Sequence, residues 1–154
     1  MSIHIPPELL KEIHAHAESA YPEEGAGLML GYEHNGNRFI TNLLKLVNAW
    51  EESPRHNRYQ ITAEDMLQGE KEAEKLGLSI MGIFHSHPDH PNLPSDFDRE
   101  WAVPWYSYLI TSVHKGEALE SKSWRLDDDR SVFHPEQIIT RKNDQGELKE
   151  IFNR

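Results

Sequence analysis

A pair of histidines directly behind a short apolar segment constrains this chain more than any other feature. The segment at residues 78–84, Leu-Ser-Ile-Met-Gly-Ile-Phe, is rich in β-forming residues and is preceded by Gly77, so it predicts a buried strand. Side chains two residues apart on a strand share one face. We therefore expect His85 and His87 to direct both imidazoles into one space.

The residues that follow should return a carboxylate to the two histidines. Prolines at positions 88, 91 and 94 disfavour regular secondary structure, so we expect a stiff loop after His87. The pattern Ser95-x-x-Asp98 is typical of a helix start. A helix that begins there brings Asp98 back toward the imidazoles in its first turn.

Two imidazoles and one carboxylate suit a metal ion with one open coordination position. A tetrahedral Zn²⁺ held in this way keeps its fourth position for water, as catalytic rather than structural zinc sites do. Mg²⁺ and Ca²⁺ prefer more oxygen ligands. The same donor set also holds ferrous iron in oxygenases, so these residues alone leave the chemistry open.

Each half of the pattern also has a simpler explanation. His85 and His87 could be partly buried side chains that bond to backbone groups. Ser95 and Asp98 could serve only as a helix cap, with Ser95 accepting a backbone N–H and Asp98 at the positive helix end. The conjunction of both halves, at fixed spacing behind a buried strand, favours the metal site.

The complete pattern resembles the signature of the JAMM (MPN+) zinc metalloproteases. His-Ser-His-Pro at 85–88 and Ser-Asp-Phe-Asp at 95–98 match the H-x-H-P-x6-S-x-x-D motif of that family. Its upstream element, Glu-x-x-Gly-Leu, is matched by Glu-Gly-Ala-Gly-Leu at 24–28. The resemblance covers about residues 21–133, most of the chain. In lacking long insertions, the chain is similar to the compact prokaryotic branch of the family.

The resemblance implies roles for five residues. His85, His87 and Asp98 would hold one Zn²⁺ per chain. Glu24 would act as the general base, and Ser95 would help to stabilise the oxyanion. Zinc lowers the pKa of bound water from about 15.7 towards ~7, so a nearby carboxylate can take the proton and pass it to a leaving amine. The implied fold is α/β, a mixed β-sheet flanked by helices, the cytidine-deaminase-like architecture of MPN domains.

Glu23 and Glu24 compete for the role of base. If a strand has already begun there, the two side chains point to opposite faces, and Glu24 shares its face with Ala26 and Leu28. The residue pattern does not decide which face meets the metal. The spacing of the family motif selects Glu24.

The activity implied by the resemblance is hydrolysis of a peptide or isopeptide bond after the Gly-Gly tail of a ubiquitin-like protein. For a compact prokaryotic member, we expect as substrate a small ubiquitin-like sulfur carrier of the ThiS or MoaD type, which loses a C-terminal amino acid or conjugate. Two alternatives stay open. One is a non-catalytic MPN scaffold, which the five intact motif residues disfavour, and the other is a zinc amidohydrolase of a small molecule.

Charge and composition restrict the partners. The chain has 16 Lys and Arg against 26 Asp and Glu, a net charge of −10, and no basic cluster that could bind phosphate, so we expect no nucleic acid partner. No stretch approaches the roughly 20 apolar residues of a membrane span, and no signal peptide is recognisable. The absence of cysteine fits a reducing compartment, and we expect a cytoplasmic protein. The sequence does not indicate an oligomeric state.

The 154 residues suit one domain. We expect a JAMM/MPN+ domain at 1–135 and a C-terminal extension at 136–154, as a late strand or a partly disordered tail. Histidines 14 and 16 should be solvated, and histidine 4 should lie at the surface or be locally bonded. Tryptophans 101 and 105 should lie in the core, with a role in shaping a substrate groove near the metal loop as the alternative. The remaining patterns predict an Asn-Gly hairpin turn at 35–36, a loop at 48–57, helices at about 7–20, 62–76 and from 95, and strands at about 25–32, 38–47, 58–61, 105–113 and 117–126.

Overall fold

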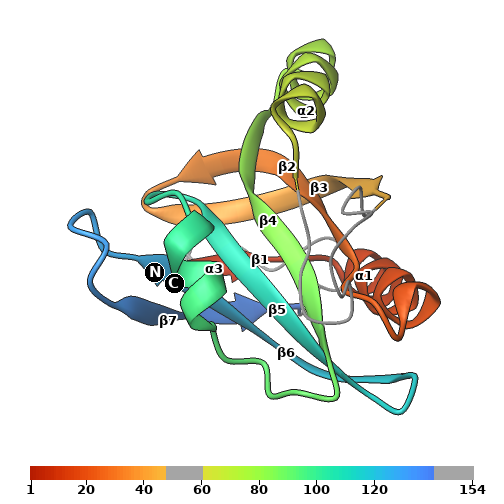
Figure 1. Ribbon diagram of the computed structural model, residues 1–154. Helices are drawn as coiled ribbons and strands as arrows, with labels where there is room; N and C mark the ends of the chain where they lie inside the picture. Colours follow the sequence, from red (N-terminus) through yellow and green to blue (C-terminus); the bar gives the residue numbers. More distant parts are fainter. Residues whose placement is uncertain (48–60, 141–154) are drawn as a thin grey trace.

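The computed structural model describes residues 1–47 and 61–140, and the strands of this part of the chain form one mixed sheet that closes into a barrel (Figure 1). Neighbouring strands follow the order β1-β3-β2-β4-β5-β6-β7, and β7 returns to β1. Together with the flanking helices, this sheet confirms the expected α/β fold. In chain order the elements are β1 (Ser2–His4), α1 (Pro7–Ala20), β2 (Ala26–His34), β3 (Asn37–Leu46), α2 (Ala63–Lys75), β4 (Ser79–Pro88), α3 (Asp96–Trp101), β5 (Ser107–His114), β6 (Glu117–Leu126) and β7 (Phe133–Ile139).

Two apolar clusters cover the two faces of the sheet. Leu28 and Leu30 of β2 pack in one cluster with Ala73 of α2. Met29, which lies between them, packs in the other cluster with Ile13 of α1. This alternation follows from the two-residue period of a strand. A side chain on the central strands therefore faces either α1 or α2.

Local sequence signals place the ends of several elements as expected. Thr62 caps α2 in a capping box, in which its Oγ1 accepts the N–H of Asp65 at 3.0 Å. The hairpin between β2 and β3 turns at Asn35 and Gly36, whose φ angles of 51° and 78° are those of a type I′ turn.

Strand β4 runs farther than the sequence indicates, since it ends at Pro88 rather than at Phe84. The N–H of Ser86 points toward β2 and donates to the carbonyl oxygen of Gly25, the residue before that strand, at 3.0 Å. Residue 88 has the same orientation but lies beyond the first residue of β2. No carbonyl oxygen of β2 therefore needs the N–H that Pro88 lacks, and the strand tolerates a proline at this position.

Strand β1 has only three residues, too few to show alternation in the sequence. It pairs in parallel with both β3 and β7. His4 is fully buried there rather than at the surface, stacks on Phe39 with ring centroids 4.4 Å apart, and bonds locally to Ser2.

The expectation that the two histidines of α1 are solvated is wrong. Both are half-buried. The Nε2 of His14 lies 2.9 Å from the Oγ of Ser121, and the Nε2 of His16 lies 3.1 Å from the carbonyl oxygen of Ala26. Helix α1 thus packs on the sheet with polar side chains beside its apolar stripe, which a count of apolar positions does not register.

Strand β7 crosses the expected boundary at residue 135 and pairs with β1 through residues 137–139. The division into a domain and an extension stays a prediction, because residues 141–154 lie outside the described residues. So do the expected loop at 48–57 and most of the expected strand at 58–61. Within the described residues, no helix has the length and apolar character needed to cross a membrane.

Close packing of β4 on β5 depends on Gly82. A Cβ at this position would overlap the backbone carbonyl of Ser107, its partner in β5. We expect Gly82→Ala to lower the free energy of unfolding by about 2–3 kcal/mol, the upper part of the range for overpacking. Urea denaturation followed by circular dichroism measures this change.

The comparison variant is Gly77→Ala, where the added Cβ meets backbone strain but no collision. Gly77 has φ 69°, and nothing lies within 4 Å of a Cβ built there. Gly77→Ala should lower the free energy of unfolding by about 1 kcal/mol. An equal loss in both variants would contradict the close contact at Gly82.

Candidate metal centre

The pairing of β2 with β4 decides which side chains meet. In this antiparallel pair, Ala26 lies opposite His85. Glu24, two residues before Ala26, and His87, two residues after His85, then point to the same face of the sheet. Glu24 is thereby brought beside His87.

Four side chains converge at the end of β4. One ligand atom each of Glu24, His85 and His87 lies within 4.8 Å of the others, and all three residues are buried. The Nε2 atoms of the two histidines are 3.3 Å apart. Asp98, in the first turn of α3, places Oδ1 3.2 Å from the Nε2 of His85 and Oδ2 3.0 Å from the Nε2 of His87. The structure thus brings together two imidazoles and two carboxylates.

A backbone contact fixes the orientation of His87. Its Nδ1 lies 2.8 Å from the carbonyl oxygen of Pro91, so we assign the ring proton to Nδ1, which donates it there. A neutral His87 then directs the lone pair of Nε2 at Asp98, and two acceptors face each other at 3.0 Å. A cation between them removes this conflict, so the residues present fit a metal ion.

Burial and neighbouring groups favour the protonation states that a metal needs. Burial lowers the pKa of His85, so its imidazole is neutral at neutral pH. Burial alone would raise the pKa of Asp98, but the interactions with His85 and His87 outweigh it and hold that pKa well below its ordinary value. A neutral imidazole and an ionised carboxylate are the forms that bind metal.

Asp98 also caps helix α3. Its Oδ2 accepts the N–H of Ser95 at 2.8 Å, and the Oγ of Ser95 accepts the N–H of Asp98 at 3.0 Å. This is a complete capping box. The helix cap and the metal site are therefore not alternative explanations of the motif, because one carboxylate both caps the helix and contacts the imidazoles.

Two further candidates lie at the margin of this group. Ser95 is exposed, and accepting the Asp98 N–H leaves its hydroxyl proton available for donation. Glu23 is half-buried, whereas Glu24 is 3% exposed. Of the two acids, Glu24 is the one grouped with His85 and His87.

A contact that sequence reasoning missed ties the segment before Glu24 to the end of β4. The hydroxyl of Tyr21 donates to the Oδ2 of Asp89 at 2.7 Å, and the Oδ1 of Asp89 accepts the N–H of Lys115 at 2.8 Å. Asp89 has φ 57°, a left-handed conformation that Asp tolerates better than most residues. One carboxylate thus joins three segments, and no periodic signal in the sequence could have revealed it.

Asn92 anchors the loop between β4 and α3. Its side-chain amide donates to the carbonyl oxygen of Glu120 at 3.0 Å, and its own carbonyl oxygen accepts the Nε1–H of Trp124 at 3.1 Å. The loop that carries the metal-site residues toward α3 is therefore fastened to β6.

The expectation that Trp101 and Trp105 lie in the core is wrong. Their side chains are 63% and 47% exposed. Trp101 ends α3 and packs beside Phe97, with ring centroids 6.0 Å apart, and Trp105 precedes β5. Neither residue belongs to the two apolar clusters.

Comparisons with known proteins agree on one family. A family model described as prokaryotic homologs of the JAB domain matches residues 6–127. The probable TtuB-protein conjugate cleaving protease of Thermus thermophilus is 35% identical over 114 residues, 72% of each chain. The desampylase of Pyrococcus furiosus is 32% identical over 118 residues, 75% of this chain and 76% of that protein.

Solved structures show the same architecture. A solution structure of a protein from Desulfitobacterium hafniense has a TM-score of 0.79 at 30% identity and covers 92% of this chain and 94% of that one. A crystal structure of a JAB1/MPN domain protein from Archaeoglobus fulgidus has a TM-score of 0.53 at 18% identity, with coverage of 90% and 96%. The second likeness concerns the fold alone.

The dual role of Asp98 gives a test that separates metal binding from helix capping. Asp98→Asn keeps an oxygen for the Ser95 N–H but removes the charge that contacts the imidazoles. We expect affinity for a divalent metal to fall at least ~10-fold, with helix content unchanged. Competition with a chromophoric chelator measures the affinity, and circular dichroism measures the helix.

Asp96→Asn is the matched control. Asp96 lies in the same helical turn, its side chain is 98% exposed, and it pairs with Arg99. This variant should bind metal as the unaltered protein does. Unchanged affinity in Asp98→Asn would remove Asp98 from the site.

Proposed function

Because the chain belongs to the family of prokaryotic homologs of the JAB domain, we propose that it is a zinc-dependent metallopeptidase. It hydrolyses a peptide or isopeptide bond after the Gly-Gly tail of a ubiquitin-like protein. The observation that carries this proposal is the convergence of His85, His87 and Asp98 beside the buried carboxylate of Glu24.

The distances between the donor atoms support one zinc ion per chain. Zinc bonds of about 2.0–2.1 Å at tetrahedral angles place ligand atoms about 3.3 Å apart. The nearest separations among the His85, His87 and Asp98 donors are 3.0–3.3 Å, with Oδ1 of Asp98 facing His85 and Oδ2 facing His87. We assign these three residues as the ligands, because Asp98 contacts both imidazole nitrogens, and Glu24 is left to act as the base.

Each residue then has one task. When bound, zinc supplies Lewis acidity, which lowers the pKa of a coordinated water towards ~7 and polarises the scissile carbonyl. Glu24 accepts a proton from the attacking water and donates it to the leaving amine. The Ser95 hydroxyl donates a hydrogen bond to the carbonyl oxygen as negative charge develops on it.

The relatives support a protein conjugate as the substrate. One is named for cleaving TtuB–protein conjugates, and the other is named a desampylase. For this chain we propose a small ubiquitin-like sulfur carrier of the ThiS or MoaD type, which loses a C-terminal amino acid or a conjugated protein. A cytoplasmic location, which a chain without cysteine suits, completes the proposal.

The proposal is tested by incubating the zinc-loaded protein with ubiquitin-like carriers from its own genome, each extended beyond Gly-Gly. Mass spectrometry should show a single cut after the second glycine that stops when a chelator removes the metal. A carrier with both glycines changed to leucine should not be cut, because we propose that the site admits only a tail without large side chains. Cleavage that persists after complete metal removal would end the proposal.

The assignment of the base has its own test. Glu24→Gln should retain one zinc per chain and lower turnover at least ~10²-fold, the usual scale for loss of a general base. Metal content is measured by elemental mass spectrometry, and turnover with the extended carrier.

Glu23→Gln provides the matched comparison, since it makes the same change one residue earlier. It should retain both zinc and most of the turnover. If Glu23→Gln is the inactive variant, the two acids have been assigned in the wrong order.

A further inference from the structure

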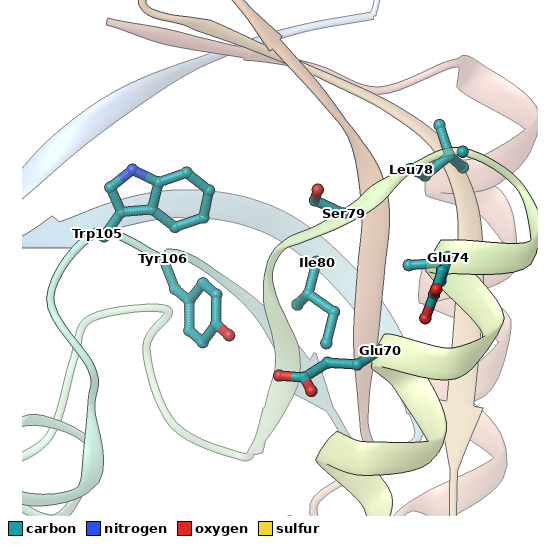
Figure 2. A pocket seen from close by; sticks show the side chains of 9 residues that line it. Glu70, Glu74, Leu78, Ser79, Ile80, Trp105 and Tyr106 are labelled. Atoms are coloured by element: carbon teal, nitrogen blue, oxygen red, sulfur yellow. The ribbon is translucent and has the colours of Figure 1, made fainter.

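A cavity of about 550 Å³ lies at the far end of β4 from the metal centre. Glu70 and Glu74 of α2 stand on one side of it, and Trp105 and Tyr106, which precede β5, stand on the other (Figure 2). Ile80 contributes to the apolar floor. The cavity thus has an apolar floor, an acidic wall formed by Glu70 and Glu74, and an aromatic wall formed by Trp105 and Tyr106.

Within the described residues, the acidic wall has no ion-pair partner. Glu70 and Glu74 are one helical turn apart, a spacing at which like charges destabilise a helix by a few tenths of a kcal/mol. Among the described ion pairs, Lys75 contacts Glu72 instead, and no cation pairs with Glu70 or Glu74. Burial raises the pKa of Tyr106, and the nearby charge of Glu70 adds to that shift. A cation placed between the two walls would relieve this repulsion.

In the aromatic wall, the partly exposed Trp105 packs on a buried arginine. Arg38 lies over the indole of Trp105, 4.1 Å from the ring centroid. Arg38 is itself 1% exposed and donates to the Oγ of Ser107 at 2.8 Å and the carbonyl oxygen of Met81 at 3.1 Å. An aromatic side chain that is 47% exposed beside two carboxylates can attract a basic side chain.

The cavity and the metal centre can contact one folded partner. Ile80 and Ile83 pack in the same apolar cluster, and His85 follows Ile83 on the same face. His85 lies five positions after Ile80 on the strand, about 17 Å at roughly 3.3 Å per residue. A domain of about 100 residues has a radius of gyration of about 13 Å, so it spans that distance.

The proposed substrate needs a second contact of this kind. A Gly-Gly tail has no side chains for the metal centre to hold, and ordering glycines costs more conformational entropy than ordering other residues. The conjugated protein differs from one conjugate to the next, whereas the carrier is constant. The net charge of −10 also favours a basic partner surface.

We propose that this cavity is a docking site for a lysine or arginine side chain on the folded body of the ubiquitin-like carrier, whose tail meanwhile reaches the metal centre. The inference rests on the proposed function. It assigns substrate affinity to the cavity and bond cleavage to the metal centre.

The test compares two substrates of the zinc-loaded enzyme, a full-length extended carrier and a short peptide that contains only its tail. In Glu70→Gln with Glu74→Gln, the KM for the carrier should rise at least ~10-fold at low salt while kcat stays unchanged, because the lost contacts are made by bound and reacting substrate alike. Cleavage of the peptide should not change. Glu72→Gln with Glu117→Gln removes the same charge elsewhere and should behave as the unaltered enzyme.

Two further variants address the aromatic wall and the partner. Trp105→Gly removes the indole at a residue whose φ of 89° glycine adopts readily, and it should raise the KM for the carrier in the same way. In Glu70→Lys with Glu74→Lys, carrier cleavage should be lost and then recovered by one carrier in which a basic residue is changed to Glu.

The outcomes separate the two proposals. If the enzyme cuts the carrier and the KM of Glu70→Gln with Glu74→Gln stays within twofold, the docking site is wrong and the peptidase stands. If the unaltered enzyme cuts neither substrate, the proposed function fails, and the docking site fails with it.

Discussion

The register between β2 and β4 is the constraint on which the site depends. Ala26 lies opposite His85, and a slip of one residue would turn Glu24 to the face covered by α1. Gly27 holds this register, because a Cβ there would overlap the ring of Phe84, its partner in β4. The glycine of the Glu-x-x-Gly-Leu element thus has a physical reason: it leaves room for an aromatic ring that keeps acid and imidazoles in line.

The sequence predicts those parts of the fold that local chemistry decides. The Asn-Gly turn at 35–36, the capped start of α2 and the strand before the histidines all depend on residues close together in the chain. The sequence fails to predict elements that depend on distant segments. β1 is a strand because β3 and β7 flank it, and Pro88 is tolerated in β4 because its position lies beyond the first residue of β2. The same limit applies to the site, where the motif residues are readable but the Tyr21–Asp89 contact is not.

Asp98 links the stability of helix α3 to the arrangement of the donor atoms at the metal centre. Its carboxylate accepts the Ser95 N–H and contacts both imidazoles, so α3 cannot shift without moving a donor. Asn92 and Trp124 fix the preceding loop, and the Pro91 carbonyl fixes the ring of His87. The donor atoms are therefore arranged by packing and backbone contacts, which lowers the entropy that metal binding must overcome.

The closure of the sheet also determines the order of assembly. Ser2 pairs with Gln137 and Ile3 with Ile138, so β1 is synthesised early yet finds one of its two neighbours only after nearly all of the described chain has been made. Contacts of such long sequence separation form late and slow the search for the native state. On the ribosome, β1 therefore waits with an edge unpaired until β7 emerges, and this interval is when the nascent chain is most open to association with its neighbours.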